Sequence, residues 1–411
     1  MVQEKITSKQ MLVQMQADHY ANALKAKEEG KPVVWSASIA MQELLETMGL
    51  TVVYPENHAA AIGARKCSPE LIADAEGHGY SSDLCSYARV NLGYVNVKHS
   101  EAQNIPLPDI LFCCDNLCHT VVKWYENLAK ELGIPMIMIN TPFVYDDEVP
   151  DRSVKYMRAE FERAIRQLEE YTHTKFDYDK LSHVMKNSNT TAEWWEKAYR
   201  TAMQVPSPLS GFDMFNYMAV AVCMRGKEEG ATLFKLWYEE LQNRAEKQIG
   251  PWDNATEKYR ILWDGIACWP YLSTTFKILK KNGINMVAST YPDIWNLRYE
   301  TDDLDGLVKA YAKHYANRNL KFSVDKITQL AKDYQLDGII YHSNRSCKLM
   351  DFRQYEIQRQ VQERTGIPSI IFDGDQTDPR VFSEAQYETR IQALVEVMKG
   401  RRKAGMKNGR L

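Results

Sequence analysis

The sequence lacks the features that mark nucleic-acid-binding and membrane proteins. It has 51 Lys and Arg against 54 Asp and Glu, so its net charge is −3 and it has no basic excess to bind a polyanion. Its longest apolar stretch, around Tyr217–Met224, falls far short of the roughly 18–20 residues that cross a bilayer. The start of the chain, Met1–Lys5, is polar and has no secretory apolar region. These absences predict a cytoplasmic protein without nucleic-acid or membrane partners.

Nucleotide-binding motifs are absent as well. The chain contains no G-x-x-x-x-G-K-[ST] motif and no G-x-G-x-x-G motif after an expected strand. Any ATP chemistry is therefore expected to belong to another protein. Disulfides are not expected either, because thiols in the cytosol are kept reduced. The eight cysteines need another explanation, as core thiols or as metal ligands.

The chain does contain a regular alternation of strands and helices. Short β-branched runs followed by amphipathic helices are typical of βαβ units with parallel sheets. The expected strands lie at Val33–Trp35, Thr51–Tyr54, Asp109–Cys114, Pro135–Ile139, Tyr259–Trp263, Met286–Ser289, Gly338–Tyr341 and Ser369–Phe372. We therefore expect an α/β protein with two Rossmann-like βαβ domains whose parallel sheets face each other, plus helical N-terminal and middle segments.

Changes in composition and periodicity along the sequence also predict the domain boundaries. Residues 1–150 are expected to form an N-terminal helix and the first α/β domain, and residues 251–398 the second α/β domain. Residues 151–250 have helical periodicity and few β-branched runs, which predicts a helical linker or insertion. The basic tail, residues 399–411, is expected to be a solvated or disordered end.

The two α/β halves resemble each other in the order of their motifs. In the first half an Asp109–Phe112 strand leads to Cys118, and in the second half an Asp337–Ile340 strand leads to Cys347. Each cysteine is followed by a helix and then by a Gly-Ile-Pro that opens the next strand. Cys118 and Cys347 are thus expected at equivalent places just beyond the carboxyl end of a strand, where open α/β sheets bind ligands.

Cys85 is the third cysteine outside an apolar run, because it lies in a polar loop that enters a helix. A thiolate at a helix start is stabilised by exposed N–H groups, which favours metal binding. Three thiolates suit an iron–sulfur cluster that leaves one iron open to a substrate. There is no C-x-x-C, and scattered cysteines are more often buried hydrophobes. The remaining cysteines are expected to be packing residues: Cys67, Cys113, Cys114, Cys223 and Cys268.

Several longer motifs resemble those of a known family over about residues 20–398. They are Trp35–Ser38, Tyr54–Ala60, Trp124–Asn127, Ser207–Asp213, His342–Met350 and Asp373–Arg380, of which Asn-Arg-Ser-Cys-Lys and Asp-Gly-Asp-Gln are the most specific. The chain resembles the larger, alpha subunit of the 2-hydroxyacyl-CoA dehydratases. The resemblance implies a [4Fe–4S] cluster held by Cys85, Cys118 and Cys347, which are the same three cysteines that the loop positions single out.

The resemblance also implies a reaction and its partners. The family converts an (R)-2-hydroxyacyl-CoA substrate to (E)-2-enoyl-CoA. One low-potential electron makes a ketyl radical anion that expels the α-hydroxyl group, and the electron is recovered after loss of the β-proton. The implied partners are a smaller beta subunit, which completes a heterodimer, and an ATP-dependent iron–sulfur activator protein that injects the electron.

Two further residues are candidates for catalysis. Ser38 follows the first strand, so it is either the N-cap of the next helix or, by resemblance, a hydrogen-bond partner of the substrate oxygen. Glu56 is either a surface or turn carboxylate or, by resemblance, a group beside the cluster that accepts a proton or orients the leaving hydroxyl. His119 and His342 are interpreted as structural. No chemical role is assigned to Asp373–Arg380.

Two alternatives remain open at this point. One is a subunit of the benzoyl-CoA-reductase type, which would consume electrons continuously. The other is a non-catalytic subunit that uses its cysteines for a relay cluster or a structural zinc ion. The acyl group of the substrate, which is lactoyl, 2-hydroxyisocaproyl, phenyllactoyl or another, is not determined by the sequence.

Overall fold

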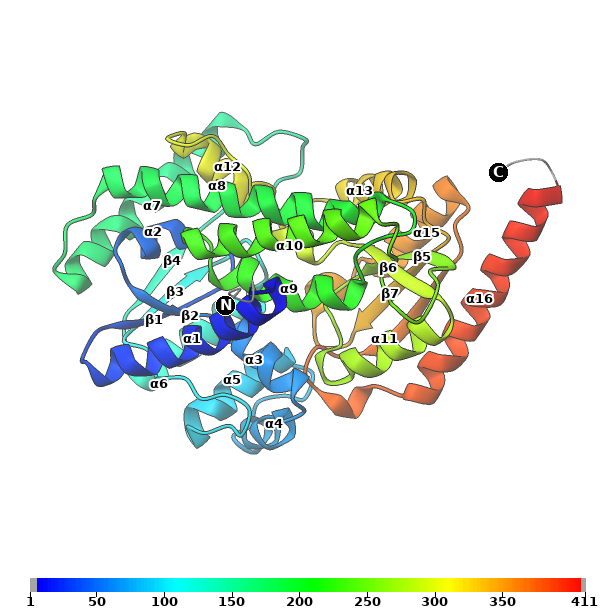
Figure 1. Ribbon diagram of the computed structural model, residues 1–411. Coiled ribbons are helices and arrows are strands. Elements are labelled where there is room, and N and C mark those ends of the chain that lie inside the picture. The colour runs from blue at the N-terminus through cyan, green and yellow to red at the C-terminus, as the bar shows by residue number, and fades with distance from the viewer. Residues whose placement is uncertain (1–5, 408–411) are drawn as a thin grey trace, which may run out of the picture.

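The computed structural model describes residues 6–407, which contain two four-stranded sheets (Figure 1). All strands in each sheet are parallel, with the orders β2-β1-β3-β4 and β6-β5-β7-β8. The strands are β1 (Val33–Ser36), β2 (Thr51–Val53), β3 (Ile110–Cys114), β4 (Met136–Ile139), β5 (Tyr259–Asp264), β6 (Ile284–Ser289), β7 (Gly338–Asn344) and β8 (Ser369–Gly374). The predicted α/β class and all eight predicted strands are confirmed.

The internal repeat extends to the hydrogen bonds at the start of each sheet. Asp109 precedes β3, and its Oδ2 accepts the backbone N–H of Val33 at 2.8 Å. Asp337 precedes β7, and its Oδ2 accepts the backbone N–H of Arg260 at 2.9 Å. Each aspartate thus joins the two central strands of its own sheet in the same way. The central strands are almost fully buried and mostly apolar, as expected for a parallel sheet covered on both faces.

The first half of the chain surrounds its sheet with helices. Thr7 caps the first of them in a capping box with Gln10. These helices are α1 (Ser8–Glu28), α2 (Gln42–Thr47), α3 (Pro55–Ala64), α4 (Ser68–Gly77), α5 (Ser86–Val97) and α6 (His119–Leu132). The alternative in which Ser38 caps α2 is wrong, because α2 begins later, at Gln42, and Met41 occupies its N-cap position with φ +56°.

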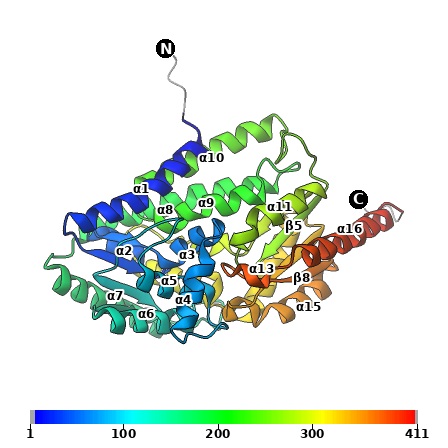
Figure 2. The same cartoon turned by 90° about the horizontal axis from the view of Figure 1, so that it is seen from below.

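Helices without strands fill the middle of the chain. They are α7 (Asp151–Thr172), α8 (Tyr178–Arg200), α9 (Gly211–Cys223) and α10 (Glu228–Glu246), and the short 3-10 helix η1 (Thr201–Met203) follows α8. Figures 1 and 2 show α8, α9 and α10 running across both sheet-containing halves. At the start of α9 the chain requires glycine, because a Cβ on Gly211 would lie 2.4 Å from the Cβ of Met286 in β6.

The second half completes the fold with its own helices. They are α11 (Leu272–Lys281), α12 (Leu304–Lys313), α13 (Leu320–Asp333), α14 (Lys348–Asp351), α15 (Gln354–Thr365) and α16 (Glu384–Lys407), with 3-10 helices η2 (Trp269–Tyr271), η3 (Pro292–Trp295), η4 (Tyr315–Asn317) and η5 (Pro379–Val381). Of the two alternatives for the basic tail, the solvated one agrees with the structure, because residues 399–407 continue α16 and residues 399–404 are exposed. Residues 408–411 lie outside the described part of the chain.

A buried charged network connects the two halves and the middle helices. Glu43 on α2 is fully buried, and its Oε1 accepts a hydrogen bond from the Nε of Arg225 at 2.8 Å. Tyr299 and Tyr311 each donate to the same carboxylate at 2.6 Å. Because a buried charge is costly unless it is paired, this network favours one relative placement of the three segments.

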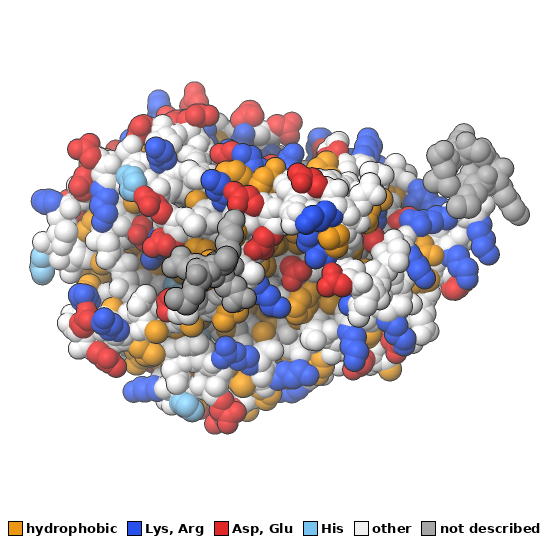
Figure 3. Space-filling model, viewed as in Figure 1, with side chains coloured by type: hydrophobic (Ala, Val, Ile, Leu, Met, Phe, Trp, Pro, Cys, Tyr) orange, Lys and Arg blue, Asp and Glu red, His pale blue; other side chains and the backbone are white. Residues whose placement is uncertain are grey.

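The outer surface carries charges of both signs. Figure 3 shows Lys and Arg side chains interspersed with Asp and Glu over one face of the molecule. Within residues 6–407, none of the helices has the length and apolar character of a membrane-spanning segment.

Candidate functional site

The three candidate cysteine ligands line one cavity. Cys85, Cys118 and Cys347 share a cavity of about 650 Å³ that both halves of the chain contribute to. In each sheet the strand order reverses between the two central strands, and Cys118 follows β3 while Cys347 follows β7. Such a switch point leaves a crevice at the carboxyl ends of the strands. The sequence therefore predicted correctly that these two cysteines occupy equivalent places.

Each of the three cysteines is the N-cap residue of a helix. Cys85 precedes α5, Cys118 precedes α6 and Cys347 precedes α14. Burial raises the pKa of all three thiols, and the pKa of Cys347 reaches about 12. The three thiols also act on one another, because Cys347 and Cys118 further raise the pKa of Cys85. Such mutual repulsion indicates three sulfurs that a cationic centre would stabilise as thiolates.

Backbone N–H groups of the first helical turns act in the opposite direction. The amide of Ala88 lowers the pKa of Cys85, and the amide of Met350 does the same for Cys347. Thr120 and Val121 do this for Cys118. These hydrogen bonds offset part of the effect of burial, although the pKa of each thiol stays above its ordinary value, and they stabilise the thiolate, which is the form that binds iron.

The donor set has the chemistry that an iron–sulfur cluster requires, because thiolates are its usual ligands. Among residues 6–407, no three His, Cys, Asp or Glu side chains are close enough to share one metal ion. In a [4Fe–4S] cluster the ligands bind separate irons, so cysteines that share a cavity without meeting at one point suit it. Asp115 and His119 also line the cavity. The Oδ1 of Asp115 already accepts the backbone N–H of Thr141 at 2.6 Å.

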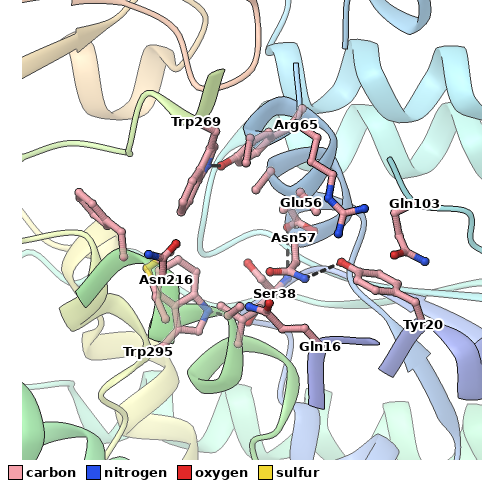
Figure 4. Close-up of a pocket in the computed structure, with 18 of the residues that line it drawn as sticks. Gln16, Tyr20, Ser38, Glu56, Asn57, Arg65, Gln103, Asn216, Trp269 and Trp295 are labelled. Carbon is pink, nitrogen blue, oxygen red and sulfur yellow. Dashed lines mark hydrogen bonds between the residues drawn. The ribbon is translucent and has the colours of Figure 1, made fainter. Parts of the chain in front are cut away.

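A second cavity holds the two candidate catalytic residues. It has a volume of about 410 Å³, and Ser38 and Glu56 are among the residues that line it (Figure 4). Its walls come from α1, α3, α9 and the 3-10 helices η2 and η3. They are largely apolar or aromatic, with Ala60, Ala61, Ala219, Phe215, Trp269 and Trp295. An apolar cavity with a few convergent polar groups is the usual form of a small-molecule site.

Ser38 and Glu56 contact each other through the backbone. The backbone N–H of Ser38 donates to the Oε1 of Glu56 at 3.1 Å, whereas the Oε2 of Glu56 is buried and has no hydrogen-bond partner. The carbonyl of Ser38 accepts hydrogen bonds from Gln42 at 3.0 Å and from Trp295 at 3.3 Å. These contacts hold the Ser38 loop in place and leave one carboxylate oxygen of Glu56 free to act on a ligand.

Burial raises the pKa of Glu56 from 4.5 to about 7, although hydrogen bonds from Ser38 oppose the rise. The interpretation of Glu56 as a surface carboxylate is therefore wrong. Its position explains this, because Pro55 starts α3 directly after β2 and turns the next side chain inward toward the crevice. A carboxyl group with a pKa near neutrality is suited to proton transfer.

The raised pKa of Glu56 predicts a pH-dependent gain in stability for Glu56→Gln. Below pH 4.5 the carboxyl is protonated in both the folded and the unfolded chain and carries no penalty. As the pH rises through 7, folding must bury the charge, so stability is lost. Because the Glu56 side chain is only half-buried, solvent screens part of the charge, and we expect the loss of stability to be on the order of 2 kcal/mol. Relative to the wild type, the free energy of unfolding of Glu56→Gln should rise by that amount from pH 5 to pH 8.

Urea unfolding at the two pH values measures this difference. The control is Glu70→Gln, which changes an exposed carboxylate in the first turn of α4 and should give the same difference from the wild type at both pH values. A pH-independent difference for Glu56→Gln would contradict the prediction.

Two tyrosines connect the two cavities. Tyr291 lines the cavity of Ser38 and Glu56, and besides burial the thiols of Cys347 and Cys85 raise its pKa. Tyr87 lines the same cavity two residues after Cys85 and accepts a hydrogen bond from the Nε1 of Trp269 at 2.6 Å. Glu56 in turn raises the pKa of Cys118. The start of α5 therefore contributes to both cavities, with Cys85 in one and Tyr87 in the other. The sequence analysis did not identify Tyr87, Tyr291 or Trp295 as site residues.

The histidines and basic residues near the cysteines differ in how deeply they are buried. His342 is fully buried in β7, where its Nδ1 contacts the carbonyl of Ile266 at 2.5 Å, and burial lowers its pKa to about 4. This agrees with a structural role. His119 is exposed and lines the cysteine cavity. Lys348 is exposed and lines that cavity too, and Arg345 is exposed beside it in sequence.

Comparison with known proteins agrees with this geometry. The sequence profile of the 2-hydroxyglutaryl-CoA dehydratase D-component matches residues 38–398. The (R)-2-hydroxyisocaproyl-CoA dehydratase alpha subunit of Clostridioides difficile is 49% identical over 405 residues, covering 97% of this chain and 98% of the relative. The (R)-phenyllactyl-CoA dehydratase alpha subunit of Clostridium sporogenes is 45% identical, covering 93% of each chain.

A protein of the benzoyl-CoA-reductase type is less similar in sequence. One subunit of the benzoyl-CoA reductase of Thauera aromatica is 28% identical, covering 95% of this chain and 94% of its own. The profile match and the higher identities both lie with the dehydratases. This chain therefore belongs to the 2-hydroxyacyl-CoA dehydratase family of enzymes, as an alpha subunit.

Proposed function

We propose that the chain uses a [4Fe–4S] cluster on Cys85, Cys118 and Cys347 to dehydrate an (R)-2-hydroxyacyl-CoA to (E)-2-enoyl-CoA. The observation that carries this proposal is that the start of α5 contributes to two cavities, one lined by three thiols and one by Ser38 and Glu56. A bound cluster supplies a low-potential electron and an iron that acts as a Lewis acid. The electron makes a ketyl radical anion of the thioester, which can expel the α-hydroxyl group.

The chain's own residues bind and orient the substrate. Ser38, placed by Gln42 and Trp295, offers its hydroxyl to the substrate oxygen. Glu56 holds or accepts the proton at Oε2, because Oε1 is already engaged by the backbone of Ser38. The aromatic and alanine walls of the cavity exclude water from the reacting carbons.

We further propose that the acyl group is bulky and apolar. Phe215, Trp269, Trp295 and the alanines of α3 offer an apolar surface to it. In agreement, two of the similar dehydratases, at 49% and 45% identity, are named for 2-hydroxyisocaproyl-CoA and phenyllactyl-CoA, whereas one at 40% is named for lactoyl-CoA. A 2-hydroxyisocaproyl group has three carbons more than a lactoyl group, and each buried CH₂ contributes about 0.8 kcal/mol.

The proposed partners are a smaller beta subunit and an ATP-dependent iron–sulfur activator. The relatives' names as alpha subunits support a multi-subunit enzyme. The absence of phosphate-binding motifs from this sequence supports a separate ATPase.

An anaerobic assay of the αβ enzyme with activator and ATP tests the proposal. We expect kcat/KM for 2-hydroxyisocaproyl-CoA or phenyllactoyl-CoA to exceed that for lactoyl-CoA by about tenfold to a hundredfold. One injected electron should support many turnovers. Steady electron consumption with benzoyl-CoA instead would favour a reductase. Zinc without iron and sulfide in the purified protein would favour a structural metal site.

A further inference from the structure

The loop after β8 is unusually polar for a buried segment. Asp375, Gln376, Thr377 and Asp378 are each at most 3% exposed. This loop carries the Asp-Gly-Asp-Gln motif, to which the proposed reaction assigns no role. Buried polar groups are costly unless they are hydrogen-bonded, so the partners of this loop indicate what it does.

Asp375 connects the loop to the segment that carries Cys347. Its Oδ2 accepts the backbone N–H of Ser346 at 3.2 Å, and its Oδ1 accepts the backbone N–H groups of Thr377 and Asp378 at 3.0 and 2.9 Å. The Oγ of Ser346 accepts the backbone N–H of Ser86 at 3.0 Å. The residues next to Cys347 and Cys85 are therefore joined to each other and to this loop.

The loop is also attached to the first half of the chain. The Oγ of Ser68 donates to the carbonyl of Thr377 at 2.6 Å, and buried Arg89 donates to Asp378 at 3.0 Å. A Cβ on Gly63 would lie 2.7 Å from the Cγ2 of Thr377, so the loop packs directly on α3. These contacts leave Gln376, between Asp375 and Thr377, little freedom to move.

Gln376 itself reaches a candidate ligand. Its Nε2 donates to the Sγ of Cys85 at 3.1 Å, while its backbone carbonyl accepts the backbone N–H of Trp269 at 3.2 Å. The side chain is fully buried, and its Oε1 has no hydrogen-bond partner. The only hydrogen bond that this buried side chain makes among the described residues is therefore the one to the sulfur of Cys85, which indicates that its position serves that contact.

We propose that Gln376 is a positioning residue that donates an N–H···S hydrogen bond to the Cys85 thiolate and thereby raises the reduction potential of the cluster. This inference rests on the cluster of the proposed function. Reduction adds one electron and hence negative charge to the cluster and its sulfurs. A hydrogen bond to sulfur is stronger in that state, so it favours reduction. The electron comes from an external reductant, and Gln376 gains and loses none.

The test replaces Gln376 by methionine in the αβ enzyme. Gln376→Met keeps an unbranched side chain of similar length but cannot donate a hydrogen bond. We expect the ratio of reduced to oxidised cluster at a set potential to fall about tenfold, which is a shift of about 59 mV to more negative potential for one electron. Titration with titanium(III) citrate, followed by electron paramagnetic resonance, measures it.

A matched control removes a glutamine hydrogen bond elsewhere. Gln358 on α15 donates its Nε2 to the Oγ of Ser369 at 3.0 Å and does not line the cysteine cavity. Gln358→Met should leave the potential unchanged. An equal shift in both variants would overturn the proposal, because it would indicate a general effect of loosened packing.

A measurement on the wild-type enzyme covers the case in which Gln376→Met does not fold. In protein labelled with 15N at the glutamine side-chain amides, hyperfine spectroscopy of the reduced cluster should show a coupled 15N nucleus. An absent coupling, or an unchanged potential in Gln376→Met with full iron content, would overturn the role of Gln376. A wild-type protein without iron and sulfide would instead overturn the proposed function, so the two failures are distinguishable.

Discussion

Cys118→Ala is expected to leave a folded αβ enzyme that lacks its [4Fe–4S] cluster and has lost turnover by at least about 10⁴-fold. The thiol is half-buried and contributes little to the core, so the fold should tolerate its loss. The cavity, however, would retain only two of its three thiols, and two cysteines do not hold a stable cubane. The same loss is expected for Cys85→Ala and Cys347→Ala. Iron and sulfide analysis and the visible absorption of the cluster measure the effect.

Cys67→Ala is the control for this prediction. Cys67 is half-buried like Cys118 and also precedes a helix, α4, but it lies outside the thiol-lined cavity. It should retain full iron content and turnover. If Cys118→Ala kept its iron, sulfide and activity, the proposed ligand set would be wrong.

The strands could be predicted from the sequence because each depends on a local pattern. A run such as Val33–Trp35 is apolar and β-branched, and it stops at small or polar residues. The end of α2 also follows a local pattern, because a glycine commonly ends a helix and Gly49 lies just past α2 with φ +68°. The start of α2 does not, because Met41 takes a left-handed conformation at φ +56° that its residue type does not favour.

The grouping of the three candidate cysteines around one cavity could be predicted for a different reason. Cys118 and Cys347 each follow a central strand, and a parallel sheet brings such loops to one edge whatever the details of packing. Cys85 lies at the start of α5 and lines the same cavity. The repeat in the sequence thus carried three-dimensional information, because two similar halves place equivalent residues at equivalent points.

The rest of the site depends on contacts between segments far apart in the sequence. Tyr291 and Trp295 lie in or beside the short helix η3, and nothing in their local pattern distinguishes them from core aromatics. Gln376 belongs to a recognisable motif, but its role depends on a contact with Cys85, 291 residues away. Such roles emerge only when the topology places the two halves against each other.

Glu56→Gln is expected to lower kcat by about 10²–10⁴-fold while KM and the iron content stay close to those of the wild type. The amide keeps the size of the side chain and a carbonyl oxygen that can accept the Ser38 N–H. It cannot accept or hold a proton at the position of Oε2, where the structure leaves an unpaired buried oxygen. Steady-state kinetics under anaerobic conditions, with activator and ATP, measure the loss.

Two further variants make this result specific to proton transfer. Glu56→Asp keeps the carboxylate but shortens its reach, so its kcat should fall between those of the wild type and Glu56→Gln. Glu46→Gln changes a half-buried carboxylate on α2 that pairs with Lys227 outside the cavity of Ser38 and Glu56, and it should retain full activity. If Glu56→Gln keeps kcat within about threefold while holding its cluster, Glu56 only shapes the cavity and the proton must move through another group. Because Tyr291 lines the same cavity as Glu56, its hydroxyl would then be the next group to test.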